Sequence, residues 1–141
     1  MSTSGVILLV DNDVRLNKEN RRALEFRRFT VHTVGSYEEA DNLLFDLRPD
    51  IIMMEAVLPD GDGFAFCEKI YGTTSASIIF LTVKSDTDDM VRGFKSGGNE
   101  YITKPVYRDL MVARVENIMR RRHREAEQYR ETVPLLKQGD G

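Results

Sequence analysis

The chain has 141 residues and a mass of 16.2 kDa, enough for one ordinary hydrophobic core but not for two full domains. Hydrophobic residues make up 41% and charged residues 30%, and no apolar run approaches the roughly 18 residues that a membrane-spanning helix needs. The single cysteine, Cys67, rules out an internal disulfide, and His32 and His123 supply no Cys/His set for zinc. Together with the absence of a secretory signal and a net charge of −3, these features predict a cytoplasmic protein that neither crosses a membrane nor binds nucleic acid generically.

Five short apolar segments have the length and composition of strands that are buried on both faces of a sheet. The first, residues 6–10, is uninterrupted and stops abruptly at an acidic loop. Four further segments repeat the pattern, at residues 30–34, 51–54, 77–82 and 100–103. We therefore predict five short strands.

Segments with helical spacing alternate with these strands. The clearest is residues 37–47, in which five apolar residues lie on one face: Tyr37, Ala40, Leu43, Leu44 and Leu47. Ser36 followed by Glu39 forms the capping box that begins this helix. Asp62 is the predicted N-cap of the next helix. The further predicted helices cover residues 14–28, 63–71, 86–96 and 107 to about 132.

Regular alternation of strand and helix, with crossovers long enough for parallel pairing, favours a parallel sheet covered by helices on both faces. The predicted fold class is α/β, a flavodoxin-like (βα)5 doubly wound five-stranded sheet with an extended C-terminal helix. Sites in such folds lie outside the carboxyl ends of the strands. The residues at those ends are Asp11, Asn12, Asp13, Glu55, Thr82, Val83, Lys104 and Pro105.

Charges of both signs meet at this edge of the predicted sheet. A nucleotide or flavin phosphate requires a glycine- and hydroxyl-rich turn after the first strand, and the acidic residues 11–13 would repel it, so a cofactor-binding flavodoxin-like domain is the weakest alternative. Oxygen ligands suit Mg²⁺, which can bridge to a phosphoryl group whose other oxygens are bound by Lys104 and Thr82.

Six short motifs occur in a fixed order, each next to a predicted strand or helix end. They are LVDND at 9–13, PDIIMM at 49–54, LPDGDGF at 58–64, LT at 81–82, GGNEYITKP at 97–105 and ARV at 113–115. In this order and at these spacings the chain resembles the receiver domain of the response-regulator family of two-component signal transduction. The resemblance covers residues 6–121, which is most of the chain.

The resemblance implies a phosphoryl group that is passed from a histidine kinase or phosphorelay protein to the residue after the third strand. That residue is Glu55. The resemblance also implies Mg²⁺ bound by Asp11, Asn12 and Glu55, together with the backbone carbonyl of Val57.

Three further residues take roles from the same resemblance. Thr82 matches the hydroxyl residue that moves toward the phosphoryl group, Tyr101 matches the aromatic switch residue, and Lys104 matches the lysine that contacts the phosphoryl group. The peptide bond of the matching lysine-proline motif, here Lys104-Pro105, is usually cis.

Two residues depart from the family pattern. Glu55 replaces the expected aspartate, and its extra methylene moves the carboxylate about 1.5 Å further into the pocket. A displacement of this size can cost about 10²-fold in an in-line transfer. Asn12 replaces an expected acid and keeps an oxygen ligand without its charge, so Mg²⁺ binding is expected to be weak or absent.

The leading interpretation is a pseudo-receiver, an interaction module rather than an enzyme. The longer carboxylate of Glu55 is expected to reach the Lys104 ammonium and the Thr82 hydroxyl and so to imitate the phosphorylated aspartate. At ~4 Å and an effective dielectric near 20 such an ion pair amounts to roughly 4 kcal/mol before desolvation is subtracted. The alternative is a functional Mg²⁺-dependent phosphoacceptor.

The sequence divides into a receiver domain at 6–121, a C-terminal helical extension at 122–133 and a polar tail at 134–141. Pro134 is expected to end the last helix near Val133. Apolar residues at alternating spacings of three and four form the seam of a coiled coil, interrupted by Arg122: Val112, Val115, Met119, Ala126, Tyr129, Val133 and Leu136. The seam suggests a homodimer contact or a helix toward an output domain, and fraying beyond Arg122 is the alternative. The resemblance places partner or output-domain contacts on residues 86–121. The basic run 120–124 is interpreted as a solvated helix face.

Overall fold

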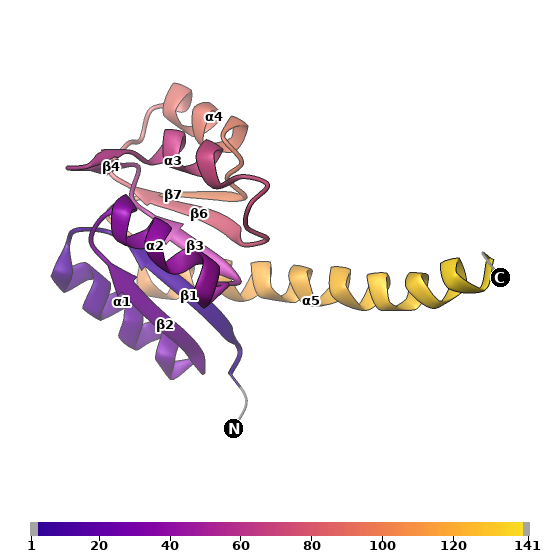
Figure 1. The fold of residues 1–141 in the computed structure, drawn as a ribbon. Helices are drawn as coiled ribbons and strands as arrows, with labels where there is room; N and C mark the ends of the chain where they lie inside the picture. Colours follow the sequence, from indigo (N-terminus) through magenta and orange to yellow (C-terminus); the bar gives the residue numbers. More distant parts are fainter. Residues whose placement is uncertain (1–2, 140–141) are drawn as a thin grey trace.

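The computed structural model describes the backbone of residues 3–139 and the side-chain surroundings of residues 3–132. Five parallel strands form one sheet in the order β2-β1-β3-β6-β7 (Figure 1). The strands are β1 (Gly5–Val10), β2 (Phe29–Val34), β3 (Ile51–Met54), β6 (Ser77–Thr82) and β7 (Glu100–Thr103). All five predicted strands are present, and the predicted α/β, flavodoxin-like fold class is confirmed.

Five helices cover the two faces of this sheet. They are α1 (Val14–Phe26), α2 (Tyr37–Leu47), α3 (Gly63–Ile70), α4 (Thr87–Lys95) and α5 (Arg108–Gly139). Buried residues of α1 and α5 form one core with one face of the strands, whereas buried residues of α2 and α3 form a second core on the opposite face. Alternate residues of each strand point into one core or the other, which is why the strands read as uninterrupted apolar runs.

Acidic and hydroxyl side chains begin the first three helices. The Ser36 hydroxyl accepts a hydrogen bond of 3.1 Å from the Glu39 N–H, and the Asp62 carboxylate accepts one of 2.9 Å from the Phe64 N–H. Both predicted caps are therefore confirmed. Asp13 caps α1 in the same manner.

A small antiparallel hairpin between β3 and α3 was not predicted as strand. It consists of β4 (Val57–Leu58) and β5 (Gly61–Asp62), which are too short for a periodic pattern to show. Its turn residue Asp60 accepts hydrogen bonds from the N–H groups of Tyr37 and Glu38. The hairpin therefore holds the start of α2 beside the carboxyl end of β3.

The last helix is longer than predicted. The backbone of α5 continues past Pro134 to Gly139, so the expected end at Val133 is wrong. A proline removes one backbone donor and can kink a helix without ending it. Val115 and Met119, assigned to the coiled-coil seam, are buried against the sheet. Tyr129 is 71% exposed, and Figure 1 shows this part of α5 extending beyond the sheet.

Two further seam residues, Val133 and Leu136, have side chains outside the described residues. Among the helices that the structure describes, none combines the length and the apolar composition that crossing a membrane requires.

Candidate functional site

Four predicted site residues meet at the carboxyl ends of the strands. Asp11, Glu55 and Thr82 are buried, and Lys104 reaches them from the loop after β7. The Lys104 ammonium lies 2.7 Å from Asp11 Oδ2 and 3.3 Å from Glu55 Oε1. The parallel order of the sheet brings together side chains that are up to 93 residues apart in the sequence.

The Glu55 carboxylate accepts two backbone hydrogen bonds in addition to its ion pair with Lys104. The Ala56 N–H donates to Oε2 over 2.6 Å, and the Val83 N–H donates to Oε1 over 3.2 Å. Glu55 therefore accepts hydrogen bonds from donors on three separate loops. Val83 has its side chain exposed and only its backbone faces the pocket.

The predicted contact between Glu55 and the Thr82 hydroxyl is not formed among the described residues. The Thr82 hydroxyl instead accepts a hydrogen bond of 3.2 Å from the Lys84 N–H, within the loop that follows β6. This loop bends so that the Val83 N–H, rather than the hydroxyl, points at the carboxylate. The prediction correctly placed a donor for Glu55 at the end of β6, but the donor is the Val83 N–H and not the Thr82 hydroxyl. A sequence does not show the direction of a backbone N–H group.

The charge state of Lys104 follows from its two carboxylate partners. Burial alone lowers the pKa of Lys104, but the hydrogen bond and charge of Asp11 and the charge of Glu55 outweigh burial and raise the pKa. Lys104 therefore remains a cation at any ordinary pH. Two buried anions and one cation leave the pocket with a net negative charge.

Asp11 is held in place by groups from α1 and from the loop before α1. Its Oδ1 accepts a hydrogen bond of 2.9 Å from the Asp13 N–H, and its backbone carbonyl accepts one of 2.7 Å from the Asn17 side chain. Asn17 is buried on the inward face of α1 and was not predicted as a site residue. A polar side chain on the apolar face of a helix was the signal that could have identified it.

The predicted Mg²⁺ ligands differ in their surroundings, since Asp11 and Glu55 are buried whereas Asn12 and Val57 are exposed. Asn12 is exposed, and Val57 lies in β4, where it pairs with Asp62. Each carboxylate oxygen of Asp11 and Glu55 already accepts a hydrogen bond from a nitrogen donor. Among the side chains that the structure describes, those of residues 3–132, no cluster of three or more His, Cys, Asp or Glu has the arrangement of a metal site. As these side chains lie, Asp11 and Glu55 pair with the Lys104 ammonium, so a divalent cation would have to displace Lys104 before it could bind both carboxylates.

Tyr101 connects the pocket loop to the outer part of the domain. Its hydroxyl donates a hydrogen bond of 2.7 Å to the Lys84 carbonyl, and its ring packs near Phe64, Phe80 and Phe94. Burial, followed by the charges of acidic neighbours, raises the pKa of Tyr101 to about 12. The Lys104-Pro105 bond is cis, as expected from the resemblance.

Tyr37, predicted only as an apolar-face residue of α2, also reaches the site. Its hydroxyl donates a short hydrogen bond to the backbone carbonyl of Glu55. Burial and then the charge of Glu55 raise the pKa of Tyr37. Gly63 lies against the same carbonyl, where a Cβ atom would meet the oxygen at 2.8 Å. Both residues fix the backbone at the position of Glu55.

A flavodoxin-like sheet with acidic, hydroxyl and lysine residues at its carboxyl edge defines a signalling receiver rather than a nucleotide-binding domain. Residues 7–116 match the response regulator receiver domain family, and the chain belongs to that family.

Two characterised relatives illustrate the match. The chain is 35% identical to the transcriptional regulatory protein AfsQ1 of Streptomyces coelicolor over 120 residues, covering 85% of this chain and 53% of that protein. It is 32% identical to the sensory transduction protein BceR of Halalkalibacterium halodurans, covering 83% of this chain and 51% of that protein. The chain thus spans about half the length of these relatives.

Solved structures agree with the fold. A two-component response regulator from Clostridium difficile has a TM-score of 0.81 and 30% identity, covering 85% of this chain and 98% of that one. A CheY-like receiver domain protein from Methanospirillum hungatei has a TM-score of 0.83 at 22% identity, covering 88% and 99% of the two chains, and shows likeness of fold alone.

Proposed function

We propose that this chain is a pseudo-receiver, a receiver domain of two-component signalling with impaired phosphorylation that signals through protein contacts. One observation carries the proposal. The Glu55 carboxylate already accepts hydrogen bonds from the Lys104 ammonium and the Val83 N–H, two donors at the position where an acquired phosphoryl group would need them. In this interpretation Glu55 is a built-in substitute for the phosphorylated aspartate.

The side-chain length of Glu55 supports the same proposal. A glutamate carries its carboxylate about 1.5 Å further from the backbone than an aspartate does. Its attacking oxygen would therefore lie within the space that an incoming phosphoryl group must occupy, and the phosphoryl group would have to displace the Lys104 and Val83 contacts. Transfer in line depends on positioning within fractions of an ångström, so we expect it to be slow.

A chain of contacts gives Glu55 a route to a partner-binding face. Its Oε1 accepts from the Val83 N–H, the next residue Lys84 offers its carbonyl to the Tyr101 hydroxyl, and the Tyr101 ring lies against Gly93 of α4. Loop and switch tyrosine are thus held in one arrangement without phosphorylation. We propose that residues 86–121 present this arrangement to an output domain, a partner protein or a second copy of the chain.

Receiver domains typically bind Mg²⁺ at the phosphorylation site, and we propose that this site binds it weakly. Asp11 already pairs with Lys104, and Asn12 contributes no charge. A hard, strongly hydrated cation gains its affinity chiefly from carboxylate charge, so the loss of one acid weakens binding. A histidine kinase or phosphorelay protein would then contact this chain without efficient phosphoryl transfer.

The test is intact mass spectrometry of the wild type, Glu55→Asp and Glu55→Gln, each incubated with acetyl phosphate in the presence and absence of Mg²⁺. We expect no adduct on the wild type or on Glu55→Gln, and a Mg²⁺-dependent phosphoryl adduct on Glu55→Asp. The glutamine variant is the matched control, because it keeps the length of Glu55 and removes only its charge. An adduct on the wild type would overturn the proposal.

A second measurement tests directly whether Glu55 substitutes for a phosphorylated aspartate. Amide chemical shifts of Val83, Lys84, Tyr101 and α4 should change in Glu55→Gln, because the charge that holds the loop is lost. Asp60→Asn is the matched comparison, because it removes a charge from a different loop, where Asp60 accepts hydrogen bonds from the first N–H groups of α2. If Glu55→Gln changes the amide chemical shifts of α4 no more than Asp60→Asn does, Glu55 does not control the proposed partner-binding face at residues 86–121.

A further inference from the structure

The strand β2 forms one edge of the sheet, so one side of its backbone has no neighbouring strand. The carbonyls of Arg28 and Val34 accept hydrogen bonds from N–H groups just before and just after β1, which places the even-numbered residues of β2 against β1. Because backbone groups alternate along a strand, the N–H and C=O groups of Phe29, Val31 and Thr33 point outward. None of these groups has a hydrogen-bond partner within the described part of the chain.

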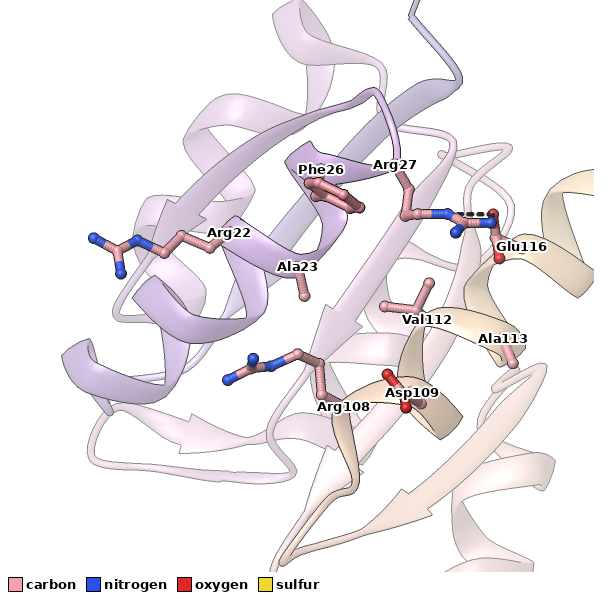
Figure 2. Close-up of a pocket in the computed structure, with 9 residues that line it drawn as sticks. All are labelled: Arg22, Ala23, Phe26, Arg27, Arg108, Asp109, Val112, Ala113 and Glu116. Atoms are coloured by element: carbon pink, nitrogen blue, oxygen red, sulfur yellow. Dashed lines mark hydrogen bonds and ion pairs between the residues drawn. The ribbon is translucent and has the colours of Figure 1, made fainter.

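A groove of about 430 Å³ follows this edge. Arg21 and Glu25 of α1 line one side of the groove, and Leu43 of α2 lines the other. The helix α1 is also fixed to α5, where Arg27 donates hydrogen bonds to Glu116 (Figure 2). The unpaired backbone of β2 is therefore accessible between two helices, one of which is anchored to a third.

The two edges of the sheet differ in their protection against pairing. Proteins usually protect a sheet edge with charged residues, proline, bulges or a very short strand. The other edge strand, β7, has four residues and carries Glu100, which pairs with Arg114 over 3.2 Å. By contrast, β2 has six residues, FTVHTV, without a carboxylate, lysine, arginine, proline or glycine. Its β-branched residues favour strand pairing, so β2 is the edge that favours addition of another strand.

We propose that β2 pairs with β2 of a second copy of this chain, antiparallel and around a two-fold axis at Val31. In this register Val31 lies opposite Val31 of the second copy, and Phe29 lies opposite its Thr33. All the outward backbone groups of residues 29, 31 and 33 then exchange hydrogen bonds, because they face one another. The exposed side chain of Thr30 lies opposite His32 of the second copy, at a position where cross-strand side chains come closest.

The charges beside the groove also suit a second copy. Arg21 and Glu25 pair over 3.0 Å, and their side chains are 48% and 47% exposed. A two-fold axis brings the same surface of each copy together, so the arginine of one copy meets a surface that carries a glutamate. Charge of one sign therefore does not accumulate between the copies. Because β7 lies at the opposite edge of the sheet, this pairing does not depend on the proposed pseudo-receiver function.

The test is analytical ultracentrifugation of the full chain and its variants over a range of concentrations. We expect the wild type to dimerise reversibly. The double variant Thr30→Lys/His32→Lys should dimerise about tenfold more weakly, because lysines then face each other across the strand pair. Ala126→Lys/Tyr129→Lys is the matched control, since it adds two lysines at exposed positions of α5, and it should dimerise as the wild type does. A wild type that stays monomeric, or a dimer that is lost in the α5 variant and kept in the β2 variant, would overturn the proposal.

A backbone variant tests the hydrogen bonds themselves. Thr33→Pro removes an N–H that points outward, and proline is tolerated in edge strands at such positions. We expect dimerisation about tenfold weaker, since one donor is lost from each copy. Thr33→Val keeps the N–H and should dimerise as the wild type does. Equal dimerisation of these two variants would contradict the proposed strand pairing.

Amide exchange of the wild type gives a measurement that requires no variant. As the protein concentration rises, exchange should slow at the outward amides of Phe29, Val31 and Thr33. The amides of Thr30 and His32 face β1, so their exchange should not depend on concentration. Exchange at residues 29, 31 and 33 that does not change with concentration, or that slows equally at residues 30 and 32, would overturn the proposal.

Discussion

The hydroxyl of Tyr101 on β7 donates a hydrogen bond to the backbone carbonyl of Lys84, two residues beyond the end of β6. In the same loop, the Val83 N–H donates a hydrogen bond to the Glu55 carboxylate. Because both hydrogen bonds hold one short loop, the carboxylate of Glu55 and the ring of Tyr101 are linked through two adjacent residues, Val83 and Lys84. This arrangement requires no long-range pathway through the core.

Replacing Tyr101 by phenylalanine should cost about 1 kcal/mol in the free energy of unfolding at neutral pH, since one partly buried hydrogen bond is lost. The folded pKa is about 12, above the ordinary value near 10, so the phenol contributes its full stability below pH 10. That contribution falls as the pH rises through the folded pKa. The difference in stability between wild type and Tyr101→Phe, measured by urea unfolding, should therefore shrink above pH 10.

Alkaline absorbance titration of the same two proteins provides the check on the assignment. The difference spectrum near 295 nm should contain one tyrosinate that forms at about pH 12. A tyrosinate that forms near pH 10 in the difference would mean that Tyr101 is not held against the loop.

Lys104→Met should destabilise the fold by about 2 to 4 kcal/mol, because it leaves two largely buried carboxylates without their cation. Lys69→Met is the matched control. Lys69 pairs with Asp41 at the surface, and its loss should cost less than about 1 kcal/mol. Urea unfolding at neutral pH measures both values. Similar losses in the two variants would contradict the description of Lys104 as the charge that holds the pocket together.

Gly63→Ala should destabilise the protein by about 1 to 3 kcal/mol, since its Cβ would lie 2.7 Å from the Ala56 Cα and from the Tyr37 hydroxyl. The variant should also disturb the Glu55 backbone, visible as shifts of the Glu55 and Ala56 amides. Gly35→Ala is the control, because its Cβ would lie 4.0 Å from the nearest neighbouring atoms, so this variant should change stability by no more than about 0.5 kcal/mol. A Gly63→Ala protein as stable as Gly35→Ala would show that α3 can shift away without cost.

Arg122→Ala should release the outer part of α5 from the domain. The Arg122 guanidinium donates 2.8 Å to the Ser75 carbonyl and 3.1 Å to the Ser77 hydroxyl. We expect faster amide exchange after residue 122 and a loss of about 1 kcal/mol in stability. Arg121→Ala, on the exposed face of the same helix, should leave amide exchange unchanged. Equal exchange in both variants would mean that α5 does not depend on this anchor.

Much of the architecture was determined by local pattern. Uninterrupted apolar runs ending in polar loops located all five strands, and three of them, residues 51–54, 77–82 and 100–103, agree with the observed limits. The caps at Ser36 and Asp62 were predictable because capping depends on residues three or fewer positions apart. The hairpin at Val57–Leu58 and Gly61–Asp62 left no such pattern, and Pro134 suggested an end to α5 that the backbone does not have.

The sequence by itself determined which residues lie at the carboxyl edge of the sheet, because parallel order brings every strand end to one side. Only the tertiary structure decided which atoms meet there. The Val83 and Ala56 N–H groups, the Asn17 amide and the Tyr37 hydroxyl contact the site through loop geometry and helix docking, which depend on contacts between distant segments. Residue types are written in the chain, whereas the direction of a backbone N–H is set by the packing around it.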